Sequence, residues 1–152
     1  MRRSVEATAL AKEPYLVWNA FVDLVASEDY ESLTRLQRVA HLAFWYDAEV
    51  RNGGHLQYFL NSAGAHRHVA IDALVALGLT GHADILRRAT AAWDSKPREE
   101  VETVDEFVNE ALENEFGEYD GAYYDSLPDV DKALESYLAE HQEEFVIVLP
   151  AS

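Results

Sequence analysis

The chain has 152 residues, of which 49% are hydrophobic and 11% aromatic, and its formal net charge is −16. This length and apolar content are typical of one folded domain and exclude a disordered acidic tail. The chain has no cysteine, which excludes disulfide scaffolds and thiol chemistry, and no apolar run suits a signal peptide or membrane span, so we expect a cytoplasmic protein without membrane contact.

Helix signals dominate the first 98 residues. Pro14 suits a first helical position, and apolar residues follow it at helical spacing. A second helix can begin at Asp29 or Ser32, and Asn52-Gly53-Gly54 predicts its end because glycine favours the backbone that terminates helices. The predicted helices of this part span residues 14–24, 29–50, 55–61, 66–77 and 80–93.

The last third continues the helical pattern. Thr103 and Glu106 form a capping box that predicts a helix start. Residues 117–128 indicate a turn-rich connection, and a final helix is expected over 129–144. The apolar segment 145–149 is interpreted as a tail against the helices rather than an intermolecular contact, and no strand pattern precedes it. Together these elements predict an all-α single domain over residues 1–152, a bundle of about six to seven helices.

The negative charge is confined to one part of the chain. Residues 1–98 carry eleven basic and eleven acidic residues, whereas residues 99–152 carry seventeen acidic residues against the single base Lys132. Nucleic-acid affinity comes from Lys and Arg that neutralise phosphates, so this distribution argues against direct nucleic-acid binding. A block of like charge instead indicates an interaction surface or a solvated face.

Two acidic helices show the same design. In the helix that begins after Thr103, one face is apolar and is predicted to be buried, while the opposite face is acidic. The apolar positions are Val104, Phe107, Val108, Ala111 and Leu112. The final helix repeats this pattern, with Val130, Ala133, Leu134, Tyr137, Leu138 and His141 expected inside.

Rows of carboxylates a few ångströms apart resemble the regular charges of a nucleic-acid backbone. We therefore predict that they bind a basic DNA-binding protein, such as a transcriptional regulator or a nucleoid protein. The alternative interpretation is a plainly solvated face. Two copies of the chain would extend the acidic strip, so the hypothesis allows a homodimer. The predicted partner-binding residues are Asp105, Glu106, Glu110, Glu113, Asp131 and Glu135.

Residues 49–64 carry a second signal, the segment E-V-R-N-G-G-H-L-Q-Y-F-L-N-S-A-G. It resembles the signature of the DNA-mimic protein family, small bacterial proteins otherwise described as a domain of unknown function, whose pattern is approximately E-x-x-N-G-G-F-x-Q-Y-F-x-N-S-x-G. His55 stands where that pattern has phenylalanine. The resemblance implies an all-helical fold and a protein that occupies the DNA-binding face of a regulatory protein. The matching residues are Asn52, Gly53, Gly54, Gln57, Tyr58, Phe59, Asn61, Ser62 and Gly64.

The residue types of this segment favour a structural role over ligand binding. Asn52 and Gly53 suit left-handed backbone at a helix end, and Gly54 allows a close approach of chains. Tyr58 and Phe59 supply core aromatics, and the polar residues Gln57, Asn61 and Ser62 are expected to bond loose backbone groups around the two helix breaks. The alternative is a small-ligand pocket lined by Asn52, His55, Gln57 and Asn61.

No motif predicts catalysis. The six histidines lack metal-ligand spacing, and the chain has no nucleophile elbow, phosphate loop or dinucleotide fingerprint. We therefore expect a protein without enzymatic activity, metal or cofactor. Besides DNA mimicry, two functions stay open: an immunity protein or antitoxin that neutralises a basic nuclease, and a small-ligand-binding domain of unknown chemistry.

Overall fold

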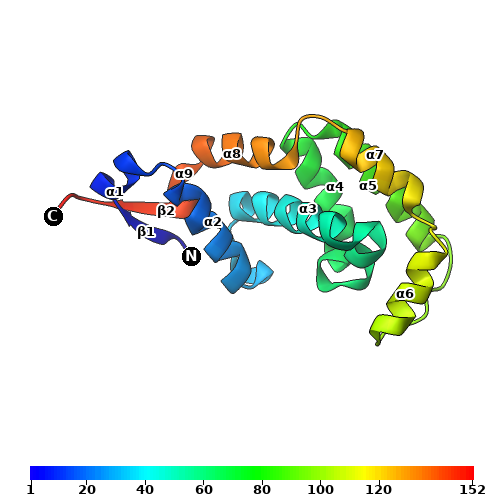
Figure 1. Cartoon of the computed structure of the whole chain (residues 1–152). Helices are drawn as coiled ribbons and strands as arrows, with labels where there is room; N and C mark the ends of the chain where they lie inside the picture. The colour runs from blue at the N-terminus through cyan, green and yellow to red at the C-terminus, as the bar shows by residue number, and fades with distance from the viewer.

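The computed structural model describes all 152 residues as an all-α bundle with one small sheet (Figure 1). Seven of its nine α-helices have nine or more residues, which confirms the predicted fold class. The helices are α1 (Ala7–Lys12), α2 (Leu16–Ser27), α3 (Arg35–Leu60), α4 (Arg67–Ala76), α5 (Thr80–Asp94), α6 (Val104–Leu112), α7 (Gly117–Asp125), α8 (Val130–Glu140) and α9 (Gln142–Phe145). The two strands are β1 (Arg3–Glu6) and β2 (Val146–Leu149), and short 3-10 helices span Tyr30–Ser32 and Ser62–His66.

Helix α3 is the central element. A capping box fixes its start: the Thr34 hydroxyl accepts from the Gln37 backbone N–H at 3.2 Å, and the Gln37 side chain accepts from the Thr34 N–H at 2.9 Å. The helix kinks at Gly53 and Gly54, then continues to Leu60. The left-handed backbone predicted at Asn52 and Gly53 is wrong, since Gly53 has φ −153° and the positive φ of +73° belongs to Gly54.

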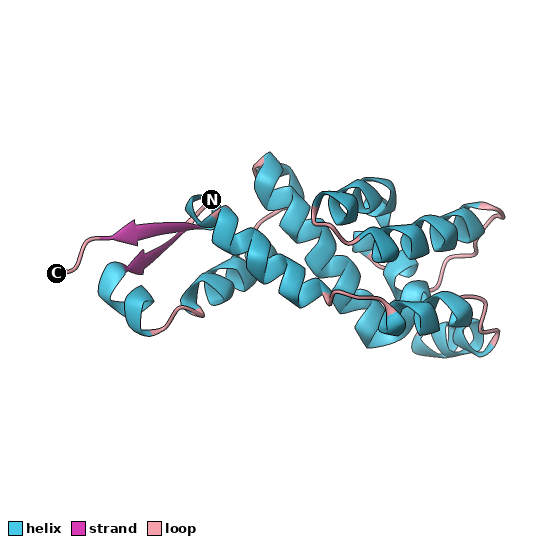
Figure 2. Cartoon of the chain, turned by 90° about the horizontal axis from the view of Figure 1, so that it is seen from above, coloured by secondary structure: helices cyan, strands magenta, loops and turns pink.

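The core is one cluster of 28 buried residues, contributed by most of the helices that pack around α3. Three tyrosines lie at its centre, with the ring of Tyr46 at 5.0 Å from that of Tyr58 and 5.6 Å from that of Tyr123. Such edge-to-face pairs stabilise a core beyond the area they bury. Viewed from above, α3 and its neighbouring helices form the body of the molecule, and the strands extend from one end (Figure 2).

The two chain ends meet in a parallel pair of strands, in which Arg3 pairs with Val146 and Glu6 with Leu149. The prediction that the apolar tail lies against the helices is therefore only half right. Val146 is buried, but Ile147, Val148 and Leu149 are exposed in β2. The expectation that no strand precedes the tail is wrong because β1, with the sequence Arg-Ser-Val-Glu, contains a single apolar residue and no readable alternation.

Residues 117–128 contain a helix instead of the predicted turn-rich connection. Helix α7 forms around the buried Tyr123, whose ring lies 5.1 Å from that of His82 on α5 and 5.6 Å from that of Tyr46 on α3. Packing thus outweighs the low helix propensity of Gly117 and Gly121. The final helix is also shorter than predicted, because α8 ends at Glu140 and α9 is a separate turn. None of the helices combines the length and apolar character that a membrane crossing requires.

Candidate functional site

Helix α6 lies at the end of the molecule opposite the chain termini (Figure 1). Its start is capped by Thr103, whose hydroxyl accepts from the Glu106 backbone N–H at 3.1 Å. None of its residues is buried: Val104, Val108 and Leu112 are 79%, 47% and 77% exposed. The prediction that the apolar face of this helix is buried is therefore wrong. The face, here called the apolar stripe of α6, comprises Val104, Phe107, Val108, Ala111 and Leu112.

The same helix carries four of the predicted partner-binding residues, here called the α6 carboxylates: Asp105, Glu106, Glu110 and Glu113. Three are exposed and Glu110 is half-buried. None forms an ion pair within the chain. Glu106 and Glu110 are four residues apart, which at about 1.5 Å per residue places them about 6 Å apart along the axis. The helix therefore presents unpaired negative charge beside an exposed apolar surface.

Helix α8 behaves differently. Its apolar face is buried as predicted, with Val130, Leu134, Tyr137 and Leu138 in the core. The α8 carboxylates, Asp131 and Glu135, are exposed and have no ion-pair partner. Partial removal from water raises the pKa of Asp131, and the negative charge of Asp47 raises this pKa further.

The six predicted residues do not form one face. Helices α6 and α8 lie in different parts of the molecule, so the structure separates the α6 carboxylates from the α8 carboxylates (Figure 1). A partner in contact with both sets would have to extend along the molecule. The two sets are therefore two candidate sites, each with its own surroundings.

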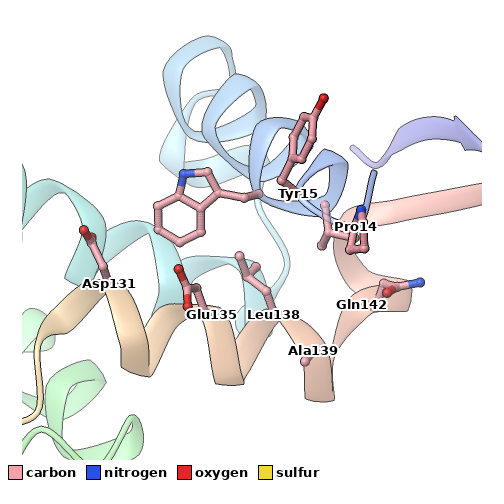
Figure 3. Close-up of a pocket in the computed structure, with 9 residues that line it drawn as sticks. Pro14, Tyr15, Asp131, Glu135, Leu138, Ala139 and Gln142 are labelled. Carbon is pink, nitrogen blue, oxygen red and sulfur yellow. The ribbon is translucent and has the colours of Figure 1, made fainter. Parts of the chain in front are cut away.

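A groove of about 600 Å³ adjoins the α8 carboxylates (Figure 3). Helix α8 forms one wall of this α2–α8 groove, and the start of α2 with the residues before it forms the other. Sequence reasoning did not find it, although Tyr15 and Trp18, three residues apart near a helix start, gave a signal for an aromatic face. The lining residues are Pro14, Tyr15, Val17, Trp18, Asp131, Glu135, Leu138, Ala139 and Gln142.

The signature segment is largely architectural. Tyr58 and Phe59 are buried, as predicted. A Cβ at Gly54 would lie 2.6 Å from a carboxylate oxygen of Asp120, so the predicted close approach at Gly54 is confirmed. The backbone at this kink therefore has no room for a side chain.

The polar residues of the signature have a partner other than the predicted backbone groups. The side-chain amides of Gln57 and Asn61 both donate to Oε2 of Glu49, each at 2.7 Å. Asn52 and Ser62 are exposed and form no side-chain hydrogen bond. Glu49 lies one to two helical turns before the kink, so these bonds tie the segment beyond the kink to the one before it.

His55 is fully buried within a hydrogen-bonded group. Its backbone N–H donates to Oδ1 of Asp120 at 2.8 Å, and its Nδ1 lies 2.7 Å from the same oxygen. On the other side of the ring, Nε2 lies 2.7 Å from the Tyr46 hydroxyl. A carboxylate only accepts, so the ring donates to it through Nδ1. His55 is thus paired on both sides and joins α3 to α7.

A buried carboxylate, Asp47, reinforces this junction. Asp47 accepts a hydrogen bond from the Tyr123 hydroxyl of α7 and another from Nε of Arg51 at 2.9 Å. Burial is the main cause that raises the pKa of Tyr123 far above its usual range, with the charge of Asp47 next. Sequence reasoning assigned no role to Asp47, Asp120 or Tyr123, because their pairing depends on contacts between distant segments.

The predicted pocket of Asn52, His55, Gln57 and Asn61 is not formed, since His55 is enclosed and the two amides bond Glu49. A different pocket of about 250 Å³ lies beside Ser62, with His41 and His66 in its lining. Burial, helped by the charge of His66, lowers the pKa of His41 to about 4. Across the whole chain, no three His, Asp or Glu residues are grouped to hold a metal ion.

The fold and these surfaces define a small all-helical protein with unpaired carboxylates on two separate helices. The model of the DMP19-like protein family matches residues 31–141. The chain therefore belongs to the DMP19-like protein family. No curated protein and no solved structure matches the chain. The matched residues include α3 to α8 and the signature, whereas β1, α1 and α2 precede them.

Proposed function

We propose that this protein binds a basic partner protein through exposed carboxylates and thereby occupies the partner's DNA-binding surface. The observation that carries the proposal is helix α6, which combines unpaired carboxylates with an uncovered apolar stripe. Solubility alone does not account for the exposure of Val104 and Leu112 beside the charges of this helix. An interface with another protein uses both kinds of surface, since an apolar contact contributes affinity and complementary charge contributes specificity.

The resemblance of residues 49–64 to the DNA-mimic proteins points to the same proposal. The signature residues match the pattern that the sequence shares with the DNA-mimic proteins, and carboxylates about 6 Å apart on α6 present negative charge at intervals comparable to phosphates along a nucleic-acid strand. The partner surface that fits them carries Lys or Arg in a similar arrangement. A transcriptional regulator or nucleoid protein has such a surface, and so has a basic nuclease that an immunity protein would neutralise.

The test is affinity capture from native lysate with the whole chain as bait, washed at low and at high salt. Glu106→Gln, Glu110→Gln and Glu113→Gln together should abolish capture of the basic partner that the wild type retains at low salt. The matched control replaces three exposed, unpaired carboxylates elsewhere, Glu6→Gln, Glu31→Gln and Asp72→Asn, and should retain it. Equal capture by both variants would reject α6 as the site.

A second candidate is the binding of a small ligand in the pocket beside Ser62. One observation favours it: Nδ1 of His41 is buried and has no hydrogen-bond partner. A small ligand with a polar group could satisfy that nitrogen. This candidate predicts no captured protein at either salt concentration, and a chemical-shift change at His41 when ligand mixtures are added.

A further inference from the structure

The α2–α8 groove has two chemically different walls. Asp131 and Glu135 lie one helical turn apart on α8, and their side chains are drawn on the side of that helix that faces α2 (Figure 3). Trp18 and Tyr15 contribute aromatic surface from the other side, with Val17, Pro14 and Leu138 completing the apolar lining. A groove of about 600 Å³ lies in the size range of small-ligand sites, so it has ample room for one long side chain of a partner.

No cation of the chain contacts the carboxylates of this groove. Neither Asp131 nor Glu135 forms an ion pair, and neither accepts a side-chain hydrogen bond. Partial desolvation and the charge of Asp47 raise the pKa of Asp131, and the more distant Arg51, which is paired with Asp47, opposes this rise. An occupant that excluded more water without bringing positive charge would make both carboxylates less stable. The occupant that fits the groove is therefore cationic.

The aromatic wall narrows the choice among cations. A guanidinium group stacks on the faces of tryptophan and tyrosine and donates paired hydrogen bonds to carboxylates, while its three-carbon stem covers apolar surface. We propose that the α2–α8 groove is a binding site for an arginine side chain of the partner protein. This inference rests on the proposed function, because it names a part of the basic partner that the protein recognises.

Two other occupants fit less well. A second copy of this chain would bring either its acidic last third, which the α8 carboxylates repel, or its first 98 residues, which carry no net positive charge. A metal ion would find only two carboxylates, and no group of three metal-binding side chains exists. The residues that match the family model, 31–141, form only part of the groove. Five lining residues lie outside them: Pro14, Tyr15, Val17, Trp18 and Gln142.

The direct test uses the whole protein and a short amidated peptide with one arginine between two leucines. Binding is followed by NMR through the indole N–H signal of Trp18, assigned with Trp18→Phe. The other two indoles are internal references, since Trp45 donates to the Val25 carbonyl and Trp93 stacks on Phe59. We expect a saturable shift of the Trp18 signal with the arginine peptide. When citrulline, the neutral isostere, replaces arginine, the affinity should fall by about tenfold or more.

Two pairs of charge-neutralising variants distinguish binding in the groove from attraction by the overall negative charge of the protein. Asp131→Asn with Glu135→Gln should abolish the saturable shift, whereas the matched pair Glu31→Gln with Asp72→Asn should leave it unchanged. A citrulline peptide that binds as well as the arginine peptide, or a shift that persists without the α8 carboxylates, would overturn the proposal.

The outcome also distinguishes this inference from the proposed function. If the peptide leaves the Trp18 signal unmoved while the wild type still captures a basic partner through α6, the arginine site is wrong and the protein-binding function stands. If the peptide binds and capture recovers no basic protein, the groove assignment stands and the DNA-binding partner is wrong.

Discussion

Helices α6 and α8 have the same sequence pattern, but only α8 has its apolar face buried. Both place apolar residues on one face and carboxylates on the other, yet α8 buries four residues in the core and α6 buries none. The difference shows that periodicity predicts a helix and its two faces, but not whether another element covers the apolar one. Coverage depends on where the chain places the helix, and α6 lies at the far end of the molecule (Figure 1).

The two helices consequently offer different kinds of surface. On α8 the carboxylates border a groove whose other wall is aromatic, so they suit a single inserted side chain. On α6 the carboxylates border an open apolar stripe, so they suit a partner that lies along the helix.

The first prediction compares one leucine from each helix. Leu134→Ala on α8 removes a fully buried side chain and should lower the free energy of unfolding by about 2–5 kcal/mol. Leu112→Ala on α6 removes a side chain that is 77% exposed and should change it by less than about 0.5 kcal/mol. Urea denaturation followed by circular dichroism measures both. Similar losses for the two variants would mean that α6 packs on the body in solution.

The second prediction concerns α7, which follows α6 in the chain and packs on α3. Tyr123→Phe removes the hydroxyl that donates to the buried Asp47 carboxylate and should lower the free energy of unfolding by about 1–3 kcal/mol. The neighbouring Tyr124 is 58% exposed, so Tyr124→Phe is a matched control with an expected change below about 0.5 kcal/mol. A Tyr123 variant as stable as this control would show that Asp47 is satisfied in another way.

The third prediction uses pH to probe the packed body. The pKa of His41 is lowered from 6.5 to about 4 in the folded chain, so the unfolded chain binds the proton more readily between these values. Its contribution is fully present above pH 6.5 and is lost as the pH falls toward 4. We expect a loss of about 1 kcal/mol, reduced because water partly reaches the ring.

His41→Phe keeps an aromatic ring beside Tyr30 and Trp45 and removes the titrating group. The free energy of unfolding of this variant should fall less steeply between pH 6.5 and pH 4 than that of the wild type. Parallel curves for the two proteins would contradict the assignment to His41.

The smallest expected effect concerns the α6 carboxylates. Glu106→Gln, Glu110→Gln and Glu113→Gln together relieve repulsion between like charges but remove the favourable charge of Glu106 at the start of α6, where it accepts the Glu102 N–H at 2.8 Å. The two effects oppose each other, so the stability of α6 should change by no more than a few tenths of a kcal/mol. Amide hydrogen exchange of residues 104–112 measures this change. A marked loss of protection would show that these carboxylates hold the helix in place. A failed capture by the triple variant would then reflect an unfolded α6 and not the loss of partner contacts.

The sequence predicted the helices well because their signals are local. The helix start at Thr103 and the break at Gly54 depend on neighbouring residues only, although the predicted capping box at Thr103 is half formed, since the Glu106 side chain accepts from the Glu102 N–H instead. The start predicted for the second helix, at Asp29 or Ser32, is wrong, because Thr34 caps α3 and the helix begins at Arg35. Helix α7 and strand β1 were not predicted, because α7 depends on Tyr123 inserting between α3 and α5 and β1 depends on pairing with the other end of the chain.

The candidate sites follow the same division. The carboxylates of α6 and α8 could be selected from composition and spacing. Their separation into two sites and the groove beside Asp131 could not, because Trp18 and Glu135 are brought together only by the packing of α2 on α8. The same applies to the pairing of His55 with Asp120, which lie 65 residues apart in the chain.

The central claim is that this protein occupies a surface that otherwise binds DNA, and competition tests it most directly. A basic protein captured on the immobilised chain at low salt is challenged with duplex DNA of increasing concentration. The account predicts that the DNA releases the partner, that the α6 triple variant does not retain it, and that the Glu6, Glu31 and Asp72 control retains it as the wild type does. A partner that duplex DNA fails to release, or that binds DNA and this protein together, would contradict the claim.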